Sequence, residues 1–485
     1  MNSFFVDDAP IAACSSGLGR RCAVSLIRLS GFQDLDDLAP FLTFGTPFPE
    51  GRRAVLCDLV DGDKTLDRVL FTHFKAPHSF TGENVAEIGV HGNVINVERI
   101  LDVLTSKGPF RLAKAGEFSY RALKNGKISL SEAEGLDLFF HSSSKDVLDR
   151  ATKLMGGELS SAYRDLRTTF LELQGALELS MDFLEDVGEE GAQRQWLLAK
   201  ENFSSRLKAL AQRFGAPLSK LLSPDIVLLG PPNSGKSSLF NRFLQTSRSI
   251  VSPTEGTTRD YVSEAIFIRG TEFRLIDTAG IREGGEEIEK EGMERSMALA
   301  AKAFFKILLI DPRRLTSYEL KPFEKVHFDL VLLTHADLPE DWAPLSLPLD
   351  FAHFAPICLK AGPIEPGKIE IQTAPIEPPP STGSIEPLPN GPIGPRSLKA
   401  LEDMIVNKYL KLLENNDILV PRQRELITKA LARWNDFEKL TIQEKDPAIL
   451  SSELSSIGHI LEELVGESAP EEVLEAVFSR FCIGK

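Results

Sequence analysis

The chain has 485 residues and a net charge of −15. This length allows roughly two to four domains, each able to bury a core. A chain this acidic does not coat nucleic acid non-specifically, so any contact with RNA requires a local basic patch or a partner. No run of about eighteen apolar residues is present, so we expect no transmembrane helix. Residues 1–10 have no basic segment and predict no secretory signal. The five cysteines lack C-x-x-C spacing, which favours reduced thiols in the cytoplasm over a disulfide framework or a zinc site.

Residues 1–118 are predicted to form an α+β domain. Strands are expected over 23–29, 53–60 and 68–74, and a helix over 94–104, where apolar residues recur at helical spacing. Asp61-Gly62-Asp63 lies between the second and third strands and is typical of a hairpin turn.

Two mainly helical parts are expected, 119–222 and 397–485. Apolar residues at three- and four-residue intervals predict helices over 133–140, 147–155, 159–181, 196–214, 398–413, 421–440, 448–464 and 471–481. Helices on both sides of an inserted domain predict one discontinuous helical domain. Two separate helical pieces are the alternative.

Residues 223–396 are predicted to form a nucleotide-binding domain. G-P-P-N-S-G-K-S, residues 230–237, fits the phosphate-binding pattern G-x-x-x-x-G-K-[ST]. An apolar strand over 226–229 precedes this loop and a helix over 238–244 follows it, which is the context that the motif requires. Backbone N–H groups and the helix N-terminus can bind phosphate oxygens. Lys236 can reach the β- and γ-phosphates, and the Ser237 hydroxyl can bind Mg²⁺.

Three later stretches indicate a GTPase. D-T-A-G, residues 277–280, follows a predicted strand over 273–276 and looks like the D-x-x-G motif. G-T-T-R-D, residues 256–260, contains threonines that can close over the metal when the third phosphate is present. T-H-A-D, residues 334–337, follows a strand over 329–333 in the place of N-K-x-D. Asp337 keeps the carboxylate that accepts guanine N–H groups, whereas Thr334 and His335 replace Asn and Lys. We therefore expect weaker guanine selectivity.

A Pro-rich segment, residues 361–396, follows the last expected strand of this domain, residues 355–358. Its repeated Pro-Ile-Glu and Gly-Pro units predict polyproline-like or disordered chain. We interpret it as a linker insertion, with docking of a partner as the alternative.

With these motifs in hand, the chain resembles the MnmE (TrmE) family of tRNA-modifying GTPases over nearly its whole length. The most specific element is the C-terminal F-C-I-G-K, residues 481–485. The N-terminal region adds I-R-L-S-G (27–31), S-F-T-G-E-N (79–84), A-G-E-F (115–118) and N-G-K (125–127).

The resemblance implies an α+β folate-binding-like N-terminal domain, a discontinuous helical domain and an inserted P-loop GTPase domain with a parallel-type sheet. It also implies a K⁺-dependent GTP hydrolase that modifies C5 of the wobble uridine of certain tRNAs in the cytoplasm. The implied partners are the flavoprotein MnmG (GidA), tRNA and a second copy bound through the N-terminal and GTPase domains. The implied cofactors are Mg²⁺, K⁺ and a 5-formyl or methylene tetrahydrofolate derivative.

The resemblance also assigns residues around the nucleotide. Ile281 stands where many small GTPases have a water-orienting Gln, so the family match makes Glu289 the catalytic carboxylate, with Lys236 and Cys482 as further catalytic candidates. A solvated helix charge is the alternative for Glu289, and a packed thiol is the alternative for Cys482. Implied metal ligands are Ser237 and Thr258 for Mg²⁺ and Asn233, Ser252, Thr254 and Thr257 for K⁺. The implied GTP-binding residues are Gly230, Asn233, Ser234, Gly235, Lys236, Ser237, Ser238, Ser252, Thr254, Gly256, Thr257, Thr258, Asp277, Thr278, Ala279, Gly280 and Asp337.

The residues that match folate-binding positions of the family are Arg28, Glu87, Lys127 and Lys485. A carboxylate can accept paired pterin N–H donors, and cations suit the glutamate tail. Ordinary surface charges are the alternative. Asn93 and Tyr120 depart from the family pattern near this site. Two other functions stay open: a GTP-binding scaffold with slow or unselective hydrolysis, and a ribosome-assembly GTPase related through the nucleotide domain alone.

Overall fold

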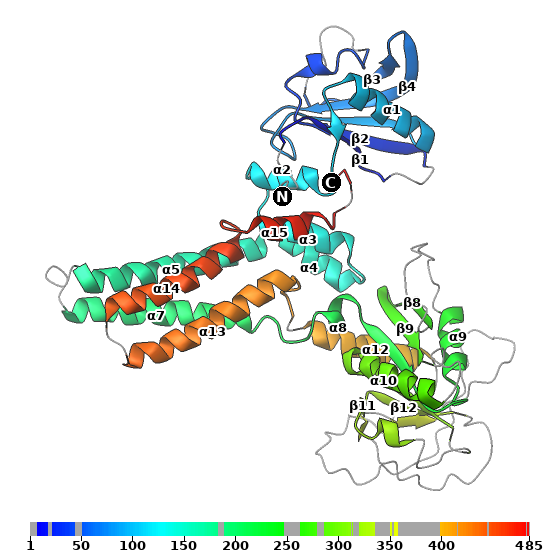
Figure 1. The fold of residues 1–485 in the computed structure, drawn as a ribbon, viewed down its shortest axis with the longest axis vertical. Helices are drawn as coiled ribbons and strands as arrows, with labels where there is room; N and C mark the ends of the chain where they lie inside the picture. The colour runs from blue at the N-terminus through cyan, green and yellow to red at the C-terminus, as the bar shows by residue number, and fades with distance from the viewer. Residues whose placement is uncertain are drawn as a thin grey trace. The chain divides into compact units, whose positions relative to one another are not determined.

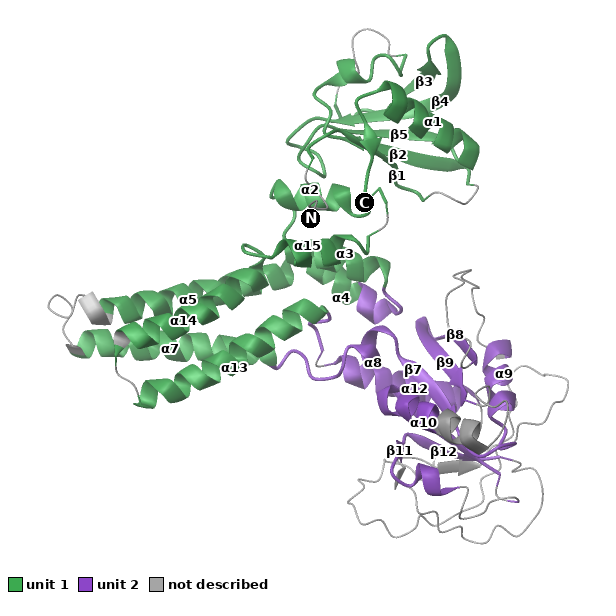
Figure 2. Ribbon diagram, viewed as in Figure 1, with its two compact units in different colours: residues 1–141, 149–211, 420–485 green, residues 142–148, 212–419 purple. Residues whose placement is uncertain are grey.

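The computed structural model of the chain divides into two compact units, which Figure 2 shows in separate colours. The first unit contains residues 1–141, 149–211 and 420–485, and the second contains 142–148 and 212–419. The structure describes residues 7–17, 22–43, 51–182, 189–246, 262–278, 286–311, 313, 320–334, 350–351, 354–356, 398–414, 416–443, 446–481 and 483–484. Among these residues, no helix is long and apolar enough to cross a membrane.

The N-terminal part of the first unit is a six-stranded sheet with the strand order β3-β4-β5-β2-β1-β6. Its strands are β1 (Ile11–Cys14), β2 (Val24–Ser30), β3 (Val55–Asp61), β4 (Lys64–Phe74), β5 (Val85–His91) and β6 (Arg111–Leu112). Neighbouring strands are antiparallel except for the parallel pair β1–β6. The predicted turn joins β3 to β4, and Gly62 has a φ of 59° there. The predicted hairpin is therefore confirmed.

One face of this sheet packs against helix α1 (Val94–Lys107). Ile100 and Leu104 of the helix share a buried core with Ile27, Phe71 and Ile88 of the strands. Successive side chains of a strand point to opposite faces, so these strands alternate between the core and the open face. The open face carries three exposed apolar side chains, Val24, Leu56 and Leu70.

The remainder of the first unit is helical. Its helices are α2 (Glu117–Lys124), α3 (Leu130–Phe140), α5 (Glu158–Asp182), α7 (Glu189–Ala211), α13 (Pro421–Gln443), α14 (Pro447–Val465) and α15 (Glu471–Phe478), with most of α4 (Lys145–Met155). Helix α5 packs against α7 and α14, and α13 packs against α7 and α14 (Figure 1). Helices from before and after the second unit therefore share one bundle.

Two buried contacts join the early and late helices of this bundle. The rings of Phe203 on α7 and Trp434 on α13 are 4.7 Å apart at the centroids. The guanidinium of Arg422, in the first turn of α13, donates to both carboxylate oxygens of Glu134 on α3, at 2.6 and 3.0 Å. A buried carboxylate paired in this way orients the two helices as well as neutralising its own charge.

The second unit is built on a sheet with the strand order β14-β12-β10-β7-β9-β8. Its strands are β7 (Asp225–Leu229), β8 (Val262–Ile268), β9 (Thr271–Asp277), β10 (Phe305–Ile310), β12 (Leu330–Leu333) and β14 (Phe354–Pro356), with a separate pair, β11 (His327–Phe328) and β13 (Asp350–Phe351). All neighbours in the main sheet are parallel except β8 and β9. Helices α8 (Ser219–Leu222), α9 (Lys236–Thr246) and α10 (Glu286–Lys302) belong to the same unit as this sheet. The predicted fold class, a parallel-type GTPase sheet with flanking helices, is confirmed.

Helix α12 (Leu398–Leu413) belongs to the second unit, which corrects the expectation that 397–485 is wholly part of the helical domain. The Tyr409 ring packs against Phe273 and Phe304, with centroids 5.6 and 5.8 Å apart. Its hydroxyl donates to the Leu221 carbonyl at 2.8 Å. The amphipathic pattern of α12 predicts a helix but does not identify the surface that covers its apolar face.

Candidate functional sites

The predicted phosphate-binding loop connects the end of β7 to the start of α9. Gly230 has a φ of 142°, and a Cβ atom placed on it would lie 2.2 Å from the Leu309 carbonyl oxygen. Asn233 and Gly235 also have positive φ values, 59° and 94°. Positive φ at several positions lets successive backbone N–H groups face one concavity. Only glycine fits at position 230, because no larger residue can approach β10 so closely.

Inside this loop, two side chains indicate an anionic ligand. The Lys236 ammonium is buried and donates to the carbonyl oxygens of Gly230 and Pro231, at 2.9 and 2.7 Å. The Ser234 hydroxyl is buried and has no hydrogen-bond partner among the described residues. A buried polar group without a partner is costly unless a ligand or water satisfies it. Phosphate oxygens would supply acceptors to both groups.

The first residue after the loop lysine lies against the D-x-x-G aspartate. Ser237 Oγ donates to Asp277 Oδ2 at 2.8 Å. The pairing follows from the sheet, because β7 and β9 are parallel neighbours with Leu228 opposite Asp277. Thr278 Oγ1 donates to the Leu228 carbonyl at 2.9 Å and holds the end of β9. A hydroxyl and a carboxylate are oxygen ligands of the kind that Mg²⁺ takes, so these residues fit that ion.

Thr334 stands at the first position of the predicted base-reading motif. It is buried, and its hydroxyl donates to the Ile310 carbonyl at 3.2 Å. The side chain therefore ties the end of β12 to the end of β10. The weakened guanine selectivity expected from Thr334 and His335 stays a prediction.

The structure does not describe the side chains of several predicted site residues. Glu289 lies within α10, and its side chain is not described. Outside the described residues lie Ser252, Thr254, Gly256, Thr257, Thr258, Ala279, Gly280, Ile281, His335, Asp337, Cys482, Lys485 and the Pro-rich residues 361–396. Their assignments remain predictions.

In the first unit, two predicted folate-site residues form an ion pair. Arg28 on β2 and Glu87 on β5 are direct cross-strand partners. Arg28 Nε and Nη2 donate to Glu87 Oε1 at 3.0 and 2.7 Å. The Arg28 guanidinium also lies about 6 Å from the ring centroids of Phe80 and Phe118, at 6.0 and 5.9 Å. Phe80 is exposed, so a flat apolar surface stands beside the paired charges.

The C-terminal end of the chain lies at the same place. The Gly484 carbonyl accepts hydrogen bonds from Ser15 Oγ at 2.8 Å and from Arg28 Nη1 at 3.3 Å. Ile483 forms an isolated antiparallel bridge with Ala115. Hydrogen bonds therefore hold Gly484, near the end of the sequence, against Ser15 and Arg28 of the N-terminal sheet. Gly484 is the immediate neighbour of Lys485, a third predicted folate residue.

The fourth predicted residue, Lys127, is exposed and lies beside the S-F-T-G-E-N segment. A Cβ atom placed on Gly82 would be 3.4 Å from Lys127 Cγ. Two residues earlier in that segment, Phe80 lies over Arg28. One short segment therefore contacts both Arg28 and Lys127.

Sequence reasoning missed an ionic network beneath this region. Arg121 on α2 is buried and donates to Glu83 Oε2 at 3.1 Å and to Glu117 Oε1 at 3.0 Å. Arg111 donates to both oxygens of Glu117, at 2.8 and 2.6 Å. Burial by itself would raise the pKa of the Glu117 carboxyl, but hydrogen bonds from Arg111, from the Lys114 N–H and from Arg121 outweigh it and hold that pKa below its usual range.

The available signal for this network was the pair of motifs S-F-T-G-E-N and A-G-E-F, which contain Glu83 and Glu117. Both carboxylates have a structural role here, because they connect α2 to the strands. The network borders a polar cavity of about 260 Å³ that Tyr120 and Lys124 also line.

Two segments of the chain match known families. Residues 10–127 match the family described as GTP-binding protein TrmE N-terminus. Residues 225–333 match the family described as 50S ribosome-binding GTPase. The second match covers the nucleotide domain alone, and the first is specific to the N-terminal domain.

Whole-length relatives carry one shared name, tRNA modification GTPase MnmE. The protein from Leptospira biflexa serovar Patoc (strain Patoc 1 / Ames) is 34% identical over 442 residues, which cover 90% of this chain and 89% of that protein. The Chlorobium phaeobacteroides protein is 31% identical, covering 98% of this chain and 97% of its own. The Aquifex aeolicus (strain VF5) protein is 30% identical, covering 98% of this chain and 99% of its own. Likeness that spans the N-terminal, helical and nucleotide regions rules out a relation through the nucleotide domain alone. The chain belongs to the MnmE family of tRNA modification GTPases and is a GTP-hydrolysing enzyme.

Proposed function

We propose that this GTPase uses K⁺-dependent GTP hydrolysis to modify C5 of the wobble uridine of certain tRNAs in the cytoplasm. It works with the flavoprotein MnmG (GidA) and takes its one-carbon unit from a 5-formyl or methylene tetrahydrofolate. The observation that carries the proposal is the joining of Arg28, Glu87 and the C-terminal Gly484. These residues stand in the same chain as a complete phosphate-binding loop.

At the nucleotide, each residue has a distinct task. The loop N–H groups and Lys236 bind the β- and γ-phosphate oxygens of GTP, and the buried Ser234 hydroxyl gains an acceptor. Ser237 and Thr258 would hold Mg²⁺, and the Asp277 carboxylate accepts a hydrogen bond from Ser237. When bound, this ion neutralises charge on the phosphates.

The attacking water requires a residue to orient it, because the apolar Ile281 cannot. We assign this task to Glu289, which acts as a positioned base on the water or on a bridging water. Asn233, Ser252, Thr254 and Thr257 hold K⁺. When bound, K⁺ supplies positive charge beside the γ-phosphate, as an arginine finger does in other GTPases.

In the first unit, the Arg28–Glu87 pair is suited to a ligand that has both donors and acceptors. Glu87 Oε2 accepts no hydrogen bond from Arg28, so this oxygen can accept a pterin N–H. The exposed Phe80 ring offers a face for the flat pterin. Lys127 and Lys485 supply positive charge for the glutamate tail. Cys482, in the same C-terminal segment, is the candidate thiol near the modified base.

Homodimerisation through the N-terminal domain is supported by its open sheet face. Leu56 and Leu70 are direct cross-strand partners and are 59% and 51% exposed, and Val24 is 65% exposed. A contiguous apolar face on a sheet is typical of a surface that another subunit covers. A second copy placed there would lie near Arg28 and Glu87, which stand on the same face of the sheet, on β2 and β5. The GTPase domains form the second contact when GTP and K⁺ are bound.

The competing function is a GTP-binding scaffold with slow or unselective hydrolysis. It is favoured by one observation, the short Thr334 side chain whose hydroxyl bonds to Ile310 at the base-reading position. The two functions differ in whether turnover is needed for modification.

The deciding experiment is complementation of a strain that lacks this gene, with nucleoside mass spectrometry of its tRNA. The wild-type gene should restore the C5 group at the wobble uridine. Glu289→Ala, in which we expect GTP affinity to be retained, should not restore it. Full restoration by Glu289→Ala would favour the scaffold, and failure of the wild-type gene would contradict the proposal.

A further inference from the structure

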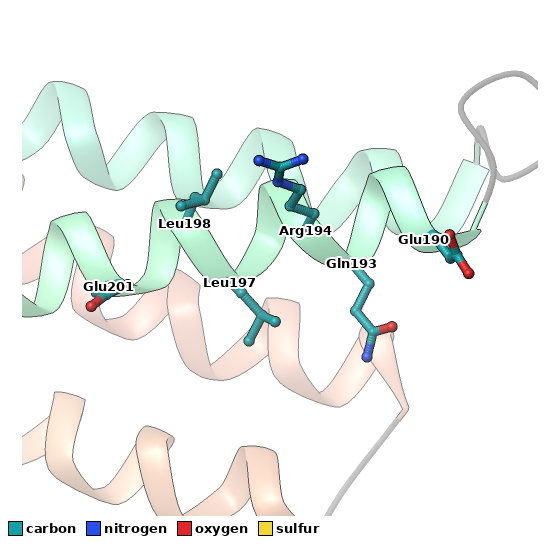
Figure 3. Close-up of a pocket in the computed structure, with 6 residues that line it drawn as sticks. All are labelled: Glu190, Gln193, Arg194, Leu197, Leu198 and Glu201. Carbon is teal, nitrogen blue, oxygen red and sulfur yellow. The ribbon is translucent and has the colours of Figure 1, made fainter.

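Helix α7 carries an exposed stripe that the fold does not use. Six residues at helical spacing line one shallow depression along the helix, as Figure 3 shows. At its centre Leu197 and Leu198 are 56% and 58% exposed. We call this set the α7 stripe: Glu190, Gln193, Arg194, Leu197, Leu198 and Glu201.

The buried side chains of α7 do not include these two leucines. Its buried side chains include Ala192, Phe203 and Leu207, on another face of the helix. Phe203 contacts Phe170 of α5 and Trp434 of α13 through its ring, with centroids 5.4 and 4.7 Å apart. A single exposed leucine is ordinary on a protein surface. Two adjacent exposed leucines bordered by charges have the apolar centre and polar rim of a small contact surface.

The charges of the stripe are arranged symmetrically about the leucines. Arg194 and Glu201 lie three and a half residues on either side of the point midway between Leu197 and Leu198. At a rise of 1.5 Å per residue, each charge is about 5 Å from that point along the axis. Among the described residues, α7 forms an ion pair with α13 through Lys208 and Glu438, and neither Arg194 nor Glu201 has an ion-pair partner. Their opposite charges are therefore available to a partner.

This arrangement is complementary to itself. When two identical helices cross in antiparallel orientation about a two-fold axis, residues equidistant from the axis face each other. An axis at the midpoint of the leucines brings Arg194 of each copy opposite Glu201 of the other. The same axis brings the two leucine pairs into contact, so the apolar centre is enclosed between two ion pairs.

We propose that the α7 stripe is an interface between two copies of this chain, separate from the N-terminal sheet face. A single helix crossing buries far less than the roughly 1,200 Å² of a stable interface. The contact is therefore weak and concentration-dependent. It links dimers that have already formed through the N-terminal sheet face into larger assemblies. Because its ion pairs are exposed, added salt weakens it.

Sedimentation velocity of the full chain over a range of concentrations tests this interface. The weight-average sedimentation coefficient of the wild type should rise with concentration. Arg194→Glu and Glu201→Arg should each place like charges opposite one another and raise the dissociation constant of this step by at least about tenfold. The double variant Arg194→Glu/Glu201→Arg should restore association, because it exchanges the charges without removing the pairs.

Two further variants separate this contact from others. Leu197→Asp/Leu198→Asp should abolish the concentration-dependent step. Arg206→Glu changes a charge on the same helix outside the stripe and should leave the step unchanged. Circular dichroism and GTP turnover check that each variant is folded. Failure of the double variant to restore association, or persistence of the step in the leucine variant, would overturn the proposal.

Discussion

The carboxyl end of the chain offers a sharp test of how the N-terminal site is assembled. Gly484 has a φ of 92°, and a Cβ atom placed on it would lie 2.8 Å from Ser15 Cα and 2.9 Å from the Cys14 carbonyl oxygen. Both neighbours are backbone atoms at the end of strand β1, so they cannot move aside cheaply. Gly484→Ala should therefore release the C-terminal segment from its docked position.

The expected magnitude follows from two contributions. A left-handed conformation costs an alanine roughly 1–2 kcal/mol. Losing the hydrogen bonds from Ser15 and Arg28 to the Gly484 carbonyl costs about 0.5–1.5 kcal/mol each. The sum, about 2–5 kcal/mol, lowers the ratio of docked to undocked segment by roughly 30-fold or more. A ligand that requires the docked segment binds in proportion to the docked fraction.

Calorimetric titration with 5-formyltetrahydrofolate measures this effect, and hydrogen exchange of the C-terminal peptide reports docking directly. We expect exchange of the C-terminal peptide to accelerate by the same factor of roughly 30 or more, and the folate dissociation constant to rise by the reciprocal of the docked fraction that remains, with GTP affinity retained. The matched control is Gly62→Ala, because Gly62 has a φ of 59° but no atom within 4 Å of an added Cβ. Gly62→Ala introduces backbone strain without a steric clash, so this variant should bind folate with normal affinity. Unchanged folate affinity together with fast exchange in Gly484→Ala would refute the role of the docked segment in this site.

Four further outcomes are expected. Replacing K⁺ by Na⁺ should slow GTP hydrolysis at least about tenfold, roughly 1.4 kcal/mol of barrier, and equal rates would exclude a K⁺ site. Glu289→Ala should lower the single-turnover rate with little change in GTP affinity; the reverse pattern would assign Glu289 to binding. GTP should be preferred over ATP by on the order of a hundredfold. In competition binding, Asp337→Asn should lose GTP affinity and gain XTP affinity. If neither affinity changes, Asp337 does not contact the base. The lowered pKa of Glu117 means that its ion pairs stabilise the fold above the ordinary glutamate pKa of about 4.3 and cease to do so as the pH falls through the lower folded value. Glu117→Gln should cost about 3–5 kcal/mol at neutral pH and flatten the acid side of the stability curve, which denaturant unfolding from pH 3 to 7 would measure; an unaltered curve would contradict this.

Local sequence signals identified most elements of the fold. The P-loop pattern located β7 and α9, and the Asp61–Asp63 turn located the β3–β4 hairpin. Long helices such as α13 and α14 were found within a few residues of their bounds because apolar spacing along a helix depends on near neighbours alone. The short elements β6 and α2 were not predicted, and neither were the longer strands β5, β8 and β10.

The nucleotide and folate sites differ in how far the sequence could define them. The phosphate-binding loop is contiguous, so its pattern names Lys236 and Ser237 together. The folate residues were identified by resemblance, since Arg28 and the C-terminal segment are far apart in the chain. The ion pairs of Glu83 and Glu117 were not predicted, because a motif shows that a residue is charged but not which distant residue pairs with it.

The sequence alone therefore determines the local conformations of this protein: its glycine turns, its phosphate-binding loop and the faces of its helices. Tertiary structure decides which surfaces meet. It assigns α12 to the nucleotide unit through Tyr409, and it joins Arg422 to Glu134, which lies 288 residues earlier. It also brings Gly484 to Arg28 across 456 residues of sequence. Backbone conformation and helical periodicity depend on neighbours along the chain, whereas the partner of a buried face or charge depends on the free energy of the whole packed core.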